Sequence, residues 1–288
     1  MRRKIVNFIF VIILLLGLGI MLYPTFSDWW NQQHQTRAIA GYVEAAKDLS
    51  AEKKKEMLAE AKKYNEELSK KQLSFNLTDE EKEEYEKILD VTGTGIMGYV
   101  NIPKIKVSLP IYHGTDEATL QIAIGHVAGT SLPVGGPGTH CVISGHTGLP
   151  SAKLFTDIDQ LEVGDHFTLE VLDQTLTYEV DQINVVLPDE LEDLEIEEGK
   201  DLCTLVTCTP YGINTHRLLV RGHRVANDAP EVMIEGEPVE EDIYVLAAVL
   251  VVLLILLAII IGPKRRKKKL KKWLAEQEEL KKQEETKK

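Results

Sequence analysis

Cysteine is scarce in this chain: its 288 residues contain three, Cys141, Cys203 and Cys208. Three cysteines are too few for a disulfide framework, and their spacing matches no zinc-binding motif. Cys141 and Cys203 would be neighbours if the strands that carry them ran parallel and in register. A bridge between adjacent strands has awkward geometry, so we expect two buried thiols, with a disulfide as the alternative. The sequence indicates neither a metal site nor a cofactor.

Basic residues are also scarce through most of the chain. Between residues 5 and 262 lie 18 of the 33 Lys and Arg residues but 40 of the 45 Asp and Glu residues, which gives this part a net charge of −22. Nucleic-acid binding needs a basic face, so this function class is excluded. The remaining basic residues cluster at the two ends, where they are typical of membrane orientation signals.

A signal-peptidase cleavage site is lacking after the first apolar run, residues 5–23, which follows a basic segment at residues 1–4. We therefore favour an uncleaved anchor over a cleaved signal peptide. A second apolar run, residues 243–262, precedes the basic residues 264–269. Both runs are long enough to cross a bilayer, and the positive-inside rule places both termini in the cytoplasm and the part between them outside the cell membrane. The tail, residues 263–288, would lie along the inner membrane face or form a solvated helix.

Residues 24–92 have a helical pattern. The stretch 37–71 is rich in Ala, Glu and Lys, and its apolar residues at helical spacing predict an amphipathic helix. A capping-box signature at residues 78–81 predicts a second helix over residues 79–89. We interpret this region as a helical stalk that leads to the next domain. The apolar positions are Met57, Ala61, Tyr64 and Leu68.

From residue 93 to 225 the pattern changes to short strands separated by Gly and Pro turns, which predicts a mainly β domain built as a closed or nearly closed barrel. Residues 118–123 and 153–161 are expected as helical or turn insertions, and residues 189–198 as a surface loop or short helix. Residues 226–242 have no periodicity and read as a flexible tether. The expected strands are residues 98–102, 107–112, 140–144, 166–171, 176–186, 202–208 and 217–225.

A thiol and a guanidinium lie at facing ends of two predicted strands. Cys208 ends one strand, the turn 210–212 follows, and Arg217 begins the next strand. A thiol that attacks a carbonyl needs donors for the oxyanion that forms, and Arg supplies fixed, permanently charged donors. The same positive charge favours the thiolate, which is the nucleophilic form of cysteine.

A cysteine nucleophile also needs a proton donor for its leaving group, usually histidine. Of the eight histidines, His146 has the matching context, because the short strand before it runs into a Gly-flanked loop. His216 is a rival, but strand alternation points it away from the face of Arg217. Arg221 is an alternative arginine that would lie too far along the strand.

Two motifs identify the site more specifically. Ser-Gly-His-Thr-Gly-Leu-Pro-Ser-Ala-Lys-Leu-Phe (144–155) and Thr-Leu-Val-Thr-Cys-Thr-Pro-Tyr-Gly-Ile-Asn-Thr-His-Arg (204–217) resemble the sortases, membrane-bound cysteine transpeptidases of Gram-positive bacteria. Segments 94–105, 109–115 and 125–136 resemble the pilus-building class C branch. The resemblance implies an eight-stranded sortase barrel with Cys208, His146 and Arg217 as catalytic residues.

Class C sortases commonly carry a lid with an Asp-Pro-aromatic tip, and residues 24–92 contain no such triplet. Phe75 is a candidate substitute, and a plain contact between the two helices is the alternative. Thr207 and Tyr211 are further candidates for substrate or lid contacts.

The resemblance implies that the chain cleaves Leu-Pro-X-Thr-Gly sorting signals between Thr and Gly and transfers the acyl group to a pilin lysine. The alternatives are a sortase that anchors surface proteins to a peptidoglycan amine and a non-catalytic membrane-tethered scaffold. The expected partners are pilins or other surface proteins that carry a sorting signal, an acceptor lysine and the lipid bilayer.

Overall fold

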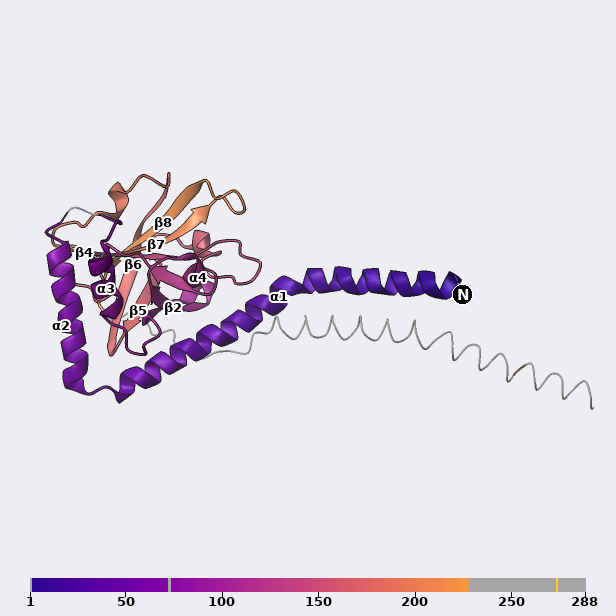
Figure 1. Cartoon of the computed structure of the whole chain (residues 1–288). Helices are drawn as coiled ribbons and strands as arrows, with labels where there is room; N and C mark the ends of the chain where they lie inside the picture. Colours follow the sequence, from indigo (N-terminus) through magenta and orange to yellow (C-terminus); the bar gives the residue numbers. More distant parts are fainter. Residues whose placement is uncertain (1, 72–73, 228–272, 274–288) are drawn as a thin grey trace, which may run out of the picture. The chain divides into compact units, whose positions relative to one another are not determined.

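The computed structural model describes residues 2–71, 74–227 and 273. Three helices come first: α1 (Arg2–Asp48), α2 (Ala51–Leu68) and α3 (Asp79–Lys87) (Figure 1). The part of α1 near the N-terminus is exposed, and the helix is long and apolar enough to cross a membrane. The predicted second span, residues 243–262, the tail and most of the tether lie outside the described residues.

The predicted helix over residues 37–71 is divided in the structure. Ser50 has an extended backbone, and its side chain accepts a hydrogen bond from the Lys53 amide at 3.1 Å, so it is the N-cap of α2. The predicted capping box of α3 is present, with Thr78 and Glu81 bonding reciprocally. α3 ends at Lys87 rather than at residue 89, because its C-cap Ile88 takes an extended backbone with φ of −77° and ψ of 129°.

Eight strands form a closed barrel in the order β1-β2-β3-β4-β7-β8-β6-β5. The pairs β2–β3 and β4–β7 are parallel and the other neighbours are antiparallel. Each of the seven predicted strands overlaps an observed one, so the predicted mainly β barrel with N-terminal helices is confirmed. The strands are β1 (Ile96–Ile102), β2 (Val107–His113), β3 (Ile124–His126), β4 (Thr139–Ser144), β5 (His166–Val171), β6 (Gln174–Val186), β7 (Asp201–Thr209) and β8 (His216–Arg224).

β3 is not among the predicted strands, because three residues are too few to show alternation. The expected helical or turn insertions are present as short helical turns: α4 (Glu117–Leu120) begins one residue before the expected 118–123, η2 (Ile158–Gln160) is the helical part of 153–161, and η3 (Glu192–Leu194) lies within 189–198. A further turn, η1 (Pro103–Ile105), joins β1 to β2.

Alternation along β7 separates the barrel interior from its outer face. Cys203 and Leu205 belong to the main core, whereas Val206 packs with a second apolar cluster on the other face. Cys141 and Cys203 are register partners on the parallel strands β4 and β7, and both are free and buried, as expected. Burial raises the pKa of Cys203 well above its ordinary value, which makes this thiol a poor nucleophile.

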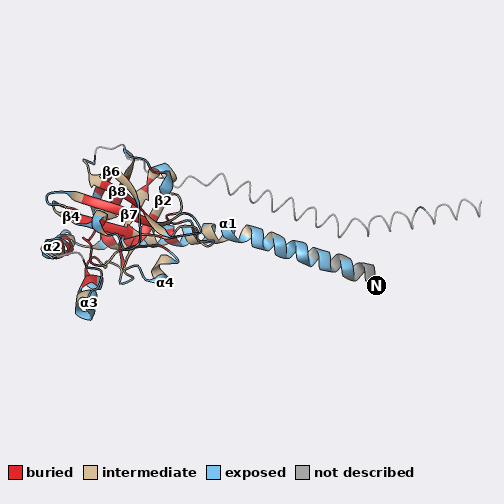
Figure 2. Ribbon diagram, turned by 90° about the horizontal axis from the view of Figure 1, so that it is seen from above, coloured by how far each residue is buried: buried red, intermediate tan, exposed pale blue. Residues whose placement is uncertain are grey.

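The helices α2 and α3 cover part of the barrel with buried apolar side chains (Figure 2). Leu58 and Ala61 of α2 and Tyr85 of α3 join the main core. The Tyr85 hydroxyl also lies 2.9 Å from Nδ1 of the buried His126 in β3. The second half of the predicted stalk is therefore part of the domain and packs directly on the barrel.

Candidate active site

The strand register places the three predicted catalytic residues at one end of the barrel. Cys208 of β7 pairs with Arg217 of β8. On the other side of β7, Ser144 of β4 pairs with Val206, so His146 and Cys208 each lie two residues beyond a paired position on parallel strands. The predicted meeting of the histidine and cysteine at strand C-terminal ends therefore follows from the observed pairing.

Cys208 differs from the other two cysteines in its environment. It is a free thiol that is half-buried, whereas Cys141 and Cys203 are enclosed in the core. Its side chain lies on the outer face of β7, two residues from Val206 on the same face. A reagent or substrate at that outer face can therefore reach Cys208.

Arg217 is held beside Cys208 by the loop before it. Its Nη1 atom donates to the carbonyl of His216 at 3.1 Å and to that of Asn214 at 3.4 Å. No other hydrogen bond of the guanidinium is found in the described part of the chain, so further N–H groups remain for an anionic oxygen. The Asn214 backbone is left-handed, with φ of 61°, which turns its carbonyl toward the guanidinium.

His146 has a buried ring nitrogen without a partner. Its Nε2 is shielded from solvent, and within residues 2–71 and 74–227 no hydrogen-bonding group meets it. A buried polar atom without a partner costs about 1–3 kcal/mol, and such atoms require an explanation. A substrate group that reaches this nitrogen would supply the missing partner.

The start of the His146 loop is fixed by β7. The Gly145 amide donates to Val206 O at 3.0 Å, and the buried Thr207 hydroxyl donates to Gly145 O at 2.8 Å. A Cβ at Gly145 would lie 2.7 Å from Ile124 Cγ2, so only glycine fits there. Thr207 is a candidate substrate contact from the sequence, but its side chain is turned to this loop and not to the outer face that carries Cys208.

Tyr211 lies on the strand-connecting loop and is 69% exposed. Its ring lies next to Gly148, where an added Cβ would come within 3.1 Å of Tyr211 Cε2. The loop between β7 and β8 therefore contacts the loop that follows His146, and Tyr211 makes this contact.

An apolar patch lies on the outer face of β7 beside Cys208 and was not identified from the sequence. Val142, Val206, Leu219 and Leu194 form it, and the half-buried Phe75 packs against it. The backbone before Phe75 lies close to Gly129, because a Cβ there would come within 2.1 Å of Ser74 O. Residues 74 and 75 thus lie against the outer face of the barrel, and Phe75 contacts the apolar patch. Alternation on β7 would have revealed Val206, but no local pattern could bring Phe75 to it.

The rival residues have other surroundings. Arg221 forms an ion pair with Asp181, at 3.0 and 3.2 Å, and a third contact with Glu197 at 3.0 Å. His216 faces Thr215, with 2.9 Å between Nδ1 and the hydroxyl. Arg221 is therefore committed to a structural network farther along β8.

His140 is a buried residue that anchors the loop between β6 and β7. Its Nδ1 lies 2.8 Å from the carbonyl of Glu195, and its Nε2 lies 2.7 Å from the Thr204 hydroxyl. A carbonyl only accepts, so Nδ1 carries the proton and Nε2 accepts from Thr204. Burial lowers the pKa of His140, which keeps the ring neutral. This residue holds the loop that carries Leu194 against the apolar patch.

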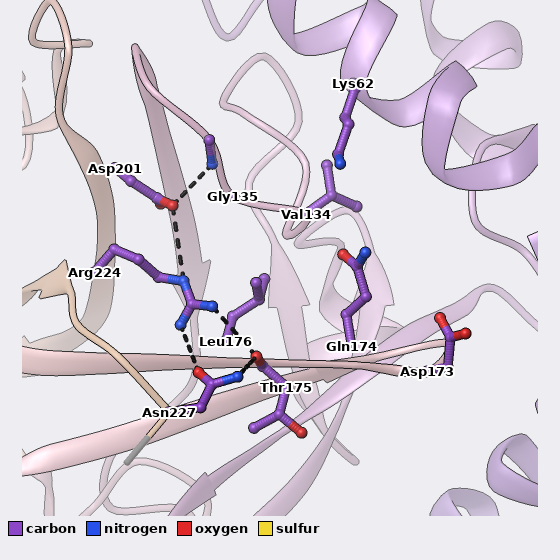
Figure 3. A pocket seen from close by; sticks show the side chains of 11 residues that line it. Lys62, Val134, Gly135, Asp173, Gln174, Thr175, Leu176, Asp201, Arg224 and Asn227 are labelled. Carbon is purple, nitrogen blue, oxygen red and sulfur yellow. Dashed lines mark hydrogen bonds and ion pairs between the residues drawn. The ribbon is translucent and has the colours of Figure 1, made fainter. Parts of the chain in front are cut away.

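A cavity of about 430 Å³ opens near the start of β7, away from Cys208 (Figure 3). Two of its charged groups are paired within the protein: Arg224 donates to the carbonyls of Thr175 and Thr177, and Asp201 accepts from the Gly136 amide. No group of three or more potential metal ligands is found in the part of the chain that the structure describes. Within the described residues two buried side-chain atoms lack a hydrogen-bond partner, Nε2 of His146 and Nδ1 of His223, and neither residue lines this cavity.

Comparison with known proteins agrees with this geometry. A sortase domain model matches residues 100–225. Sortase A of Bacillus anthracis is 30% identical over 134 residues, 46% of this chain and 62% of the relative, so the matched region spans less than two thirds of that protein.

Solved structures match over more of their length. Sortase C1 of Streptococcus agalactiae is 52% identical, with a TM-score of 0.65, over 67% of this chain and 100% of that one. Sortase C of Clostridium perfringens, solved with the C-terminal cell wall sorting motif, is 44% identical, with a TM-score of 0.59, over 66% of this chain and 99% of that one. The chain therefore belongs to the sortase family of cysteine transpeptidases, and its structural neighbours are class C sortases.

Proposed function

We propose that this chain polymerises pilins, with Cys208 as nucleophile, His146 as general acid and base, and Arg217 as oxyanion donor. The observation that carries the proposal is the register of Cys208 with Arg217 beside the unpartnered Nε2 of His146. The sorting motif bound in the Clostridium perfringens structure indicates the class of substrate.

In the first step the Cys208 thiolate attacks the Thr–Gly carbonyl of a Leu-Pro-X-Thr-Gly signal. An S–C bond forms, and the carbonyl oxygen becomes an oxyanion that Arg217 stabilises with its available N–H groups. As the C–N bond breaks, protonated His146 gives its proton to the departing glycine amine. The product is a thioester on Cys208.

In the second step a lysine amine of the next pilin attacks the thioester. Neutral His146 takes the proton that the amine loses, the C–S bond breaks, and an isopeptide bond joins the two subunits. Water in place of the amine would release the acid and make the enzyme a slow hydrolase.

The apolar patch fits the leucine and proline that precede the scissile bond. Val206 lies two residues from Cys208 on the same face, and Val142 and Leu219 flank it. Phe75 lies on this patch, so we assign the Phe75 segment as a lid that a substrate displaces. In this proposal the segment acts as a lid although it lacks the Asp-Pro-aromatic tip, because the ring of Phe75 packs on the patch in its place.

The proposed setting is the outer face of a cell membrane. α1 would be the first anchor, and residues 243–262 the second, with both termini in the cytoplasm. Two anchors would hold the face that carries Cys208 close to the bilayer, where a membrane-bound pilin presents its sorting signal.

The test is intact-mass spectrometry of the full chain in detergent micelles with a Leu-Pro-X-Thr-Gly peptide. We expect an acyl adduct on wild-type protein and none on Cys208→Ala; the absence of an adduct on both would support the scaffold alternative. Addition of a pilin lysine peptide or a peptidoglycan-type amine then separates polymerisation from wall anchoring by which amine releases the adduct.

A further inference from the structure

One face of α1 contacts the barrel at several positions along the helix. The contacting residues are Asp28, Asn31, Gln35 and Tyr42, spaced by three, four and seven residues, so they share one helical face. The two positions nearest the apolar part of α1 contact the loop that follows His146. This contact is separate from the strand pairing that aligns the catalytic residues.

Asp28 and Asn31 bind the backbone of the histidine loop. The Lys153 amide donates to Asp28 Oδ1 at 2.7 Å, and Asn31 Nδ2 donates to Ser151 O at 2.6 Å. Gln32 Nε2, one turn along α1, donates to Asp28 Oδ2 at 2.9 Å and orients the carboxylate. A hydrogen bond to a charged acceptor is about twice as strong as a neutral one, so Asp28 is the stronger of the two contacts.

The loop needs support on this side. Ala152, Leu154 and Phe155 are buried in the barrel core, so the amide of residue 153 and the carbonyl of residue 151 face outward to α1. Leu154 has φ of 39°, a left-handed conformation that costs a residue other than glycine about 1–3 kcal/mol. Such a conformation persists only where contacts on both sides enforce it.

The supported loop leads directly to the catalytic histidine. The Phe155 amide donates to His146 O at 3.1 Å, which closes the loop one residue after Leu154. With Thr207 fixing Gly145, the backbone of His146 is held from both directions. A shift at residues 151–153 would therefore pass to the His146 ring.

The contacts of Asp28 and Asn31 with the histidine loop, called the clamp from here on, lie beside the membrane-interface residues of α1. Trp29 and Trp30, 40% and 53% exposed, lie between Asp28 and Asn31 in the sequence, and indoles are enriched at membrane interfaces. At a rise of about 1.5 Å per residue, the clamp is within one helical turn of these rings.

We infer that Asp28 and Asn31 are positioning residues for the proposed transfer reaction, through which the membrane anchor holds the His146 loop in its catalytic geometry. The inference rests on the proposed function of His146. It assigns to the membrane-proximal turn of α1 a role in the rate of the reaction in addition to tethering.

The experiment uses the full chain in lipid nanodiscs and measures kcat and KM for transfer of a Leu-Pro-X-Thr-Gly peptide. The Asp28→Ala/Asn31→Ala double variant should lose about tenfold or more in kcat, since misplacing a catalytic group by about 1 Å can cost about 100-fold. Its KM should stay within about twofold, because the apolar patch beside Cys208 is unchanged. Asp28→Asn keeps an oxygen for the Lys153 amide and should retain most of the activity.

Gln35→Ala is the matched control, because it removes a similar bond from α1, the 2.9 Å contact of Nε2 with Ile122 O, away from the histidine loop. It should keep the wild-type kcat. Equal loss in this variant, or wild-type kcat in the double variant, would overturn the inference.

Hydrogen exchange of residues 151–155 tests the contact without relying on activity. The amides should exchange faster in the double variant than in wild type, and unchanged exchange would refute the clamp even if the wild type formed no acyl adduct. The near-isosteric Asn31→Asp places an oxygen against Ser151 O, so it should also lower kcat and speed the exchange of these amides. This variant keeps the test usable should the double variant misfold.

Discussion

Replacing Phe75 with alanine should make the Cys208 thiol several-fold more reactive. The ring packs against Val142, Val206 and Leu219, on the same face of the barrel as the thiol. Cys208 is half-buried in this arrangement, so we expect reagents to reach it faster when the segment that carries Phe75 moves away. The variant weakens the closed arrangement without altering the nucleophile.

The size of the effect follows from the area that the ring buries. Full burial of a phenylalanine side chain is worth about 1.5–3 kcal/mol, and Phe75 is half-buried, so its contact contributes about 1 kcal/mol. Since about 1.4 kcal/mol is a factor of ten, the open fraction should rise about fivefold. The alkylation rate should rise by the same factor while the closed state predominates.

The assay is iodoacetamide alkylation of the full chain in micelles, followed by intact mass. Cys141 and Cys203 are buried in the core, so the fast phase belongs to Cys208 and should vanish in Cys208→Ala. Leu77→Ala is the control, because it removes an apolar side chain from the same segment but away from the patch. If Phe75→Ala, Leu77→Ala and wild type react at one rate, Phe75 does not cover the thiol.

Three further predictions follow from the site. Arg217→Ala should reduce transfer about 100-fold or more, which is the scale of losing one oxyanion donor. Arg217→Lys should restore little activity, because one ammonium lacks the guanidinium fork. A near-wild-type kcat/KM in Arg217→Ala would refute the role of Arg217 as oxyanion donor. Thr207→Val should lower the unfolding free energy by about 1–3 kcal/mol in urea because Gly145 O loses its donor, whereas Thr207→Ser should stay near wild type. Burial lowers the pKa of His140, so its stabilising contribution is complete above the unfolded value of about 6.5 and is lost as pH falls below it. The unfolding free energy should therefore fall between pH 7 and 5, and less steeply in His140→Gln; equal slopes would contradict this account.

Local patterns in the sequence predicted much of the fold. β-branched runs between turns indicated seven strands, and the capping box at Thr78 indicated α3. Periodicity failed where an element was short or was ended by one residue: β3 has three residues, and Ser50 divides the predicted stalk with a single side-chain cap. Such boundaries depend on one hydrogen bond, which a window average does not register.

The candidate site was predictable because Cys208, His146 and Arg217 each follow or begin a strand, and strand ends meet when neighbours pair. The sequence by itself therefore predicted which residues carry the proposed chemistry and which segments resemble membrane anchors. Only the tertiary structure decided what surrounds that chemistry. It places Phe75 on the patch beside Cys208, turns Thr207 to Gly145, and brings Asp28 and Asn31 to the loop after His146. These contacts join residues up to 125 positions apart, as Asp28 and Lys153 are, and depend on closure of the barrel and docking of the helices rather than on local propensity.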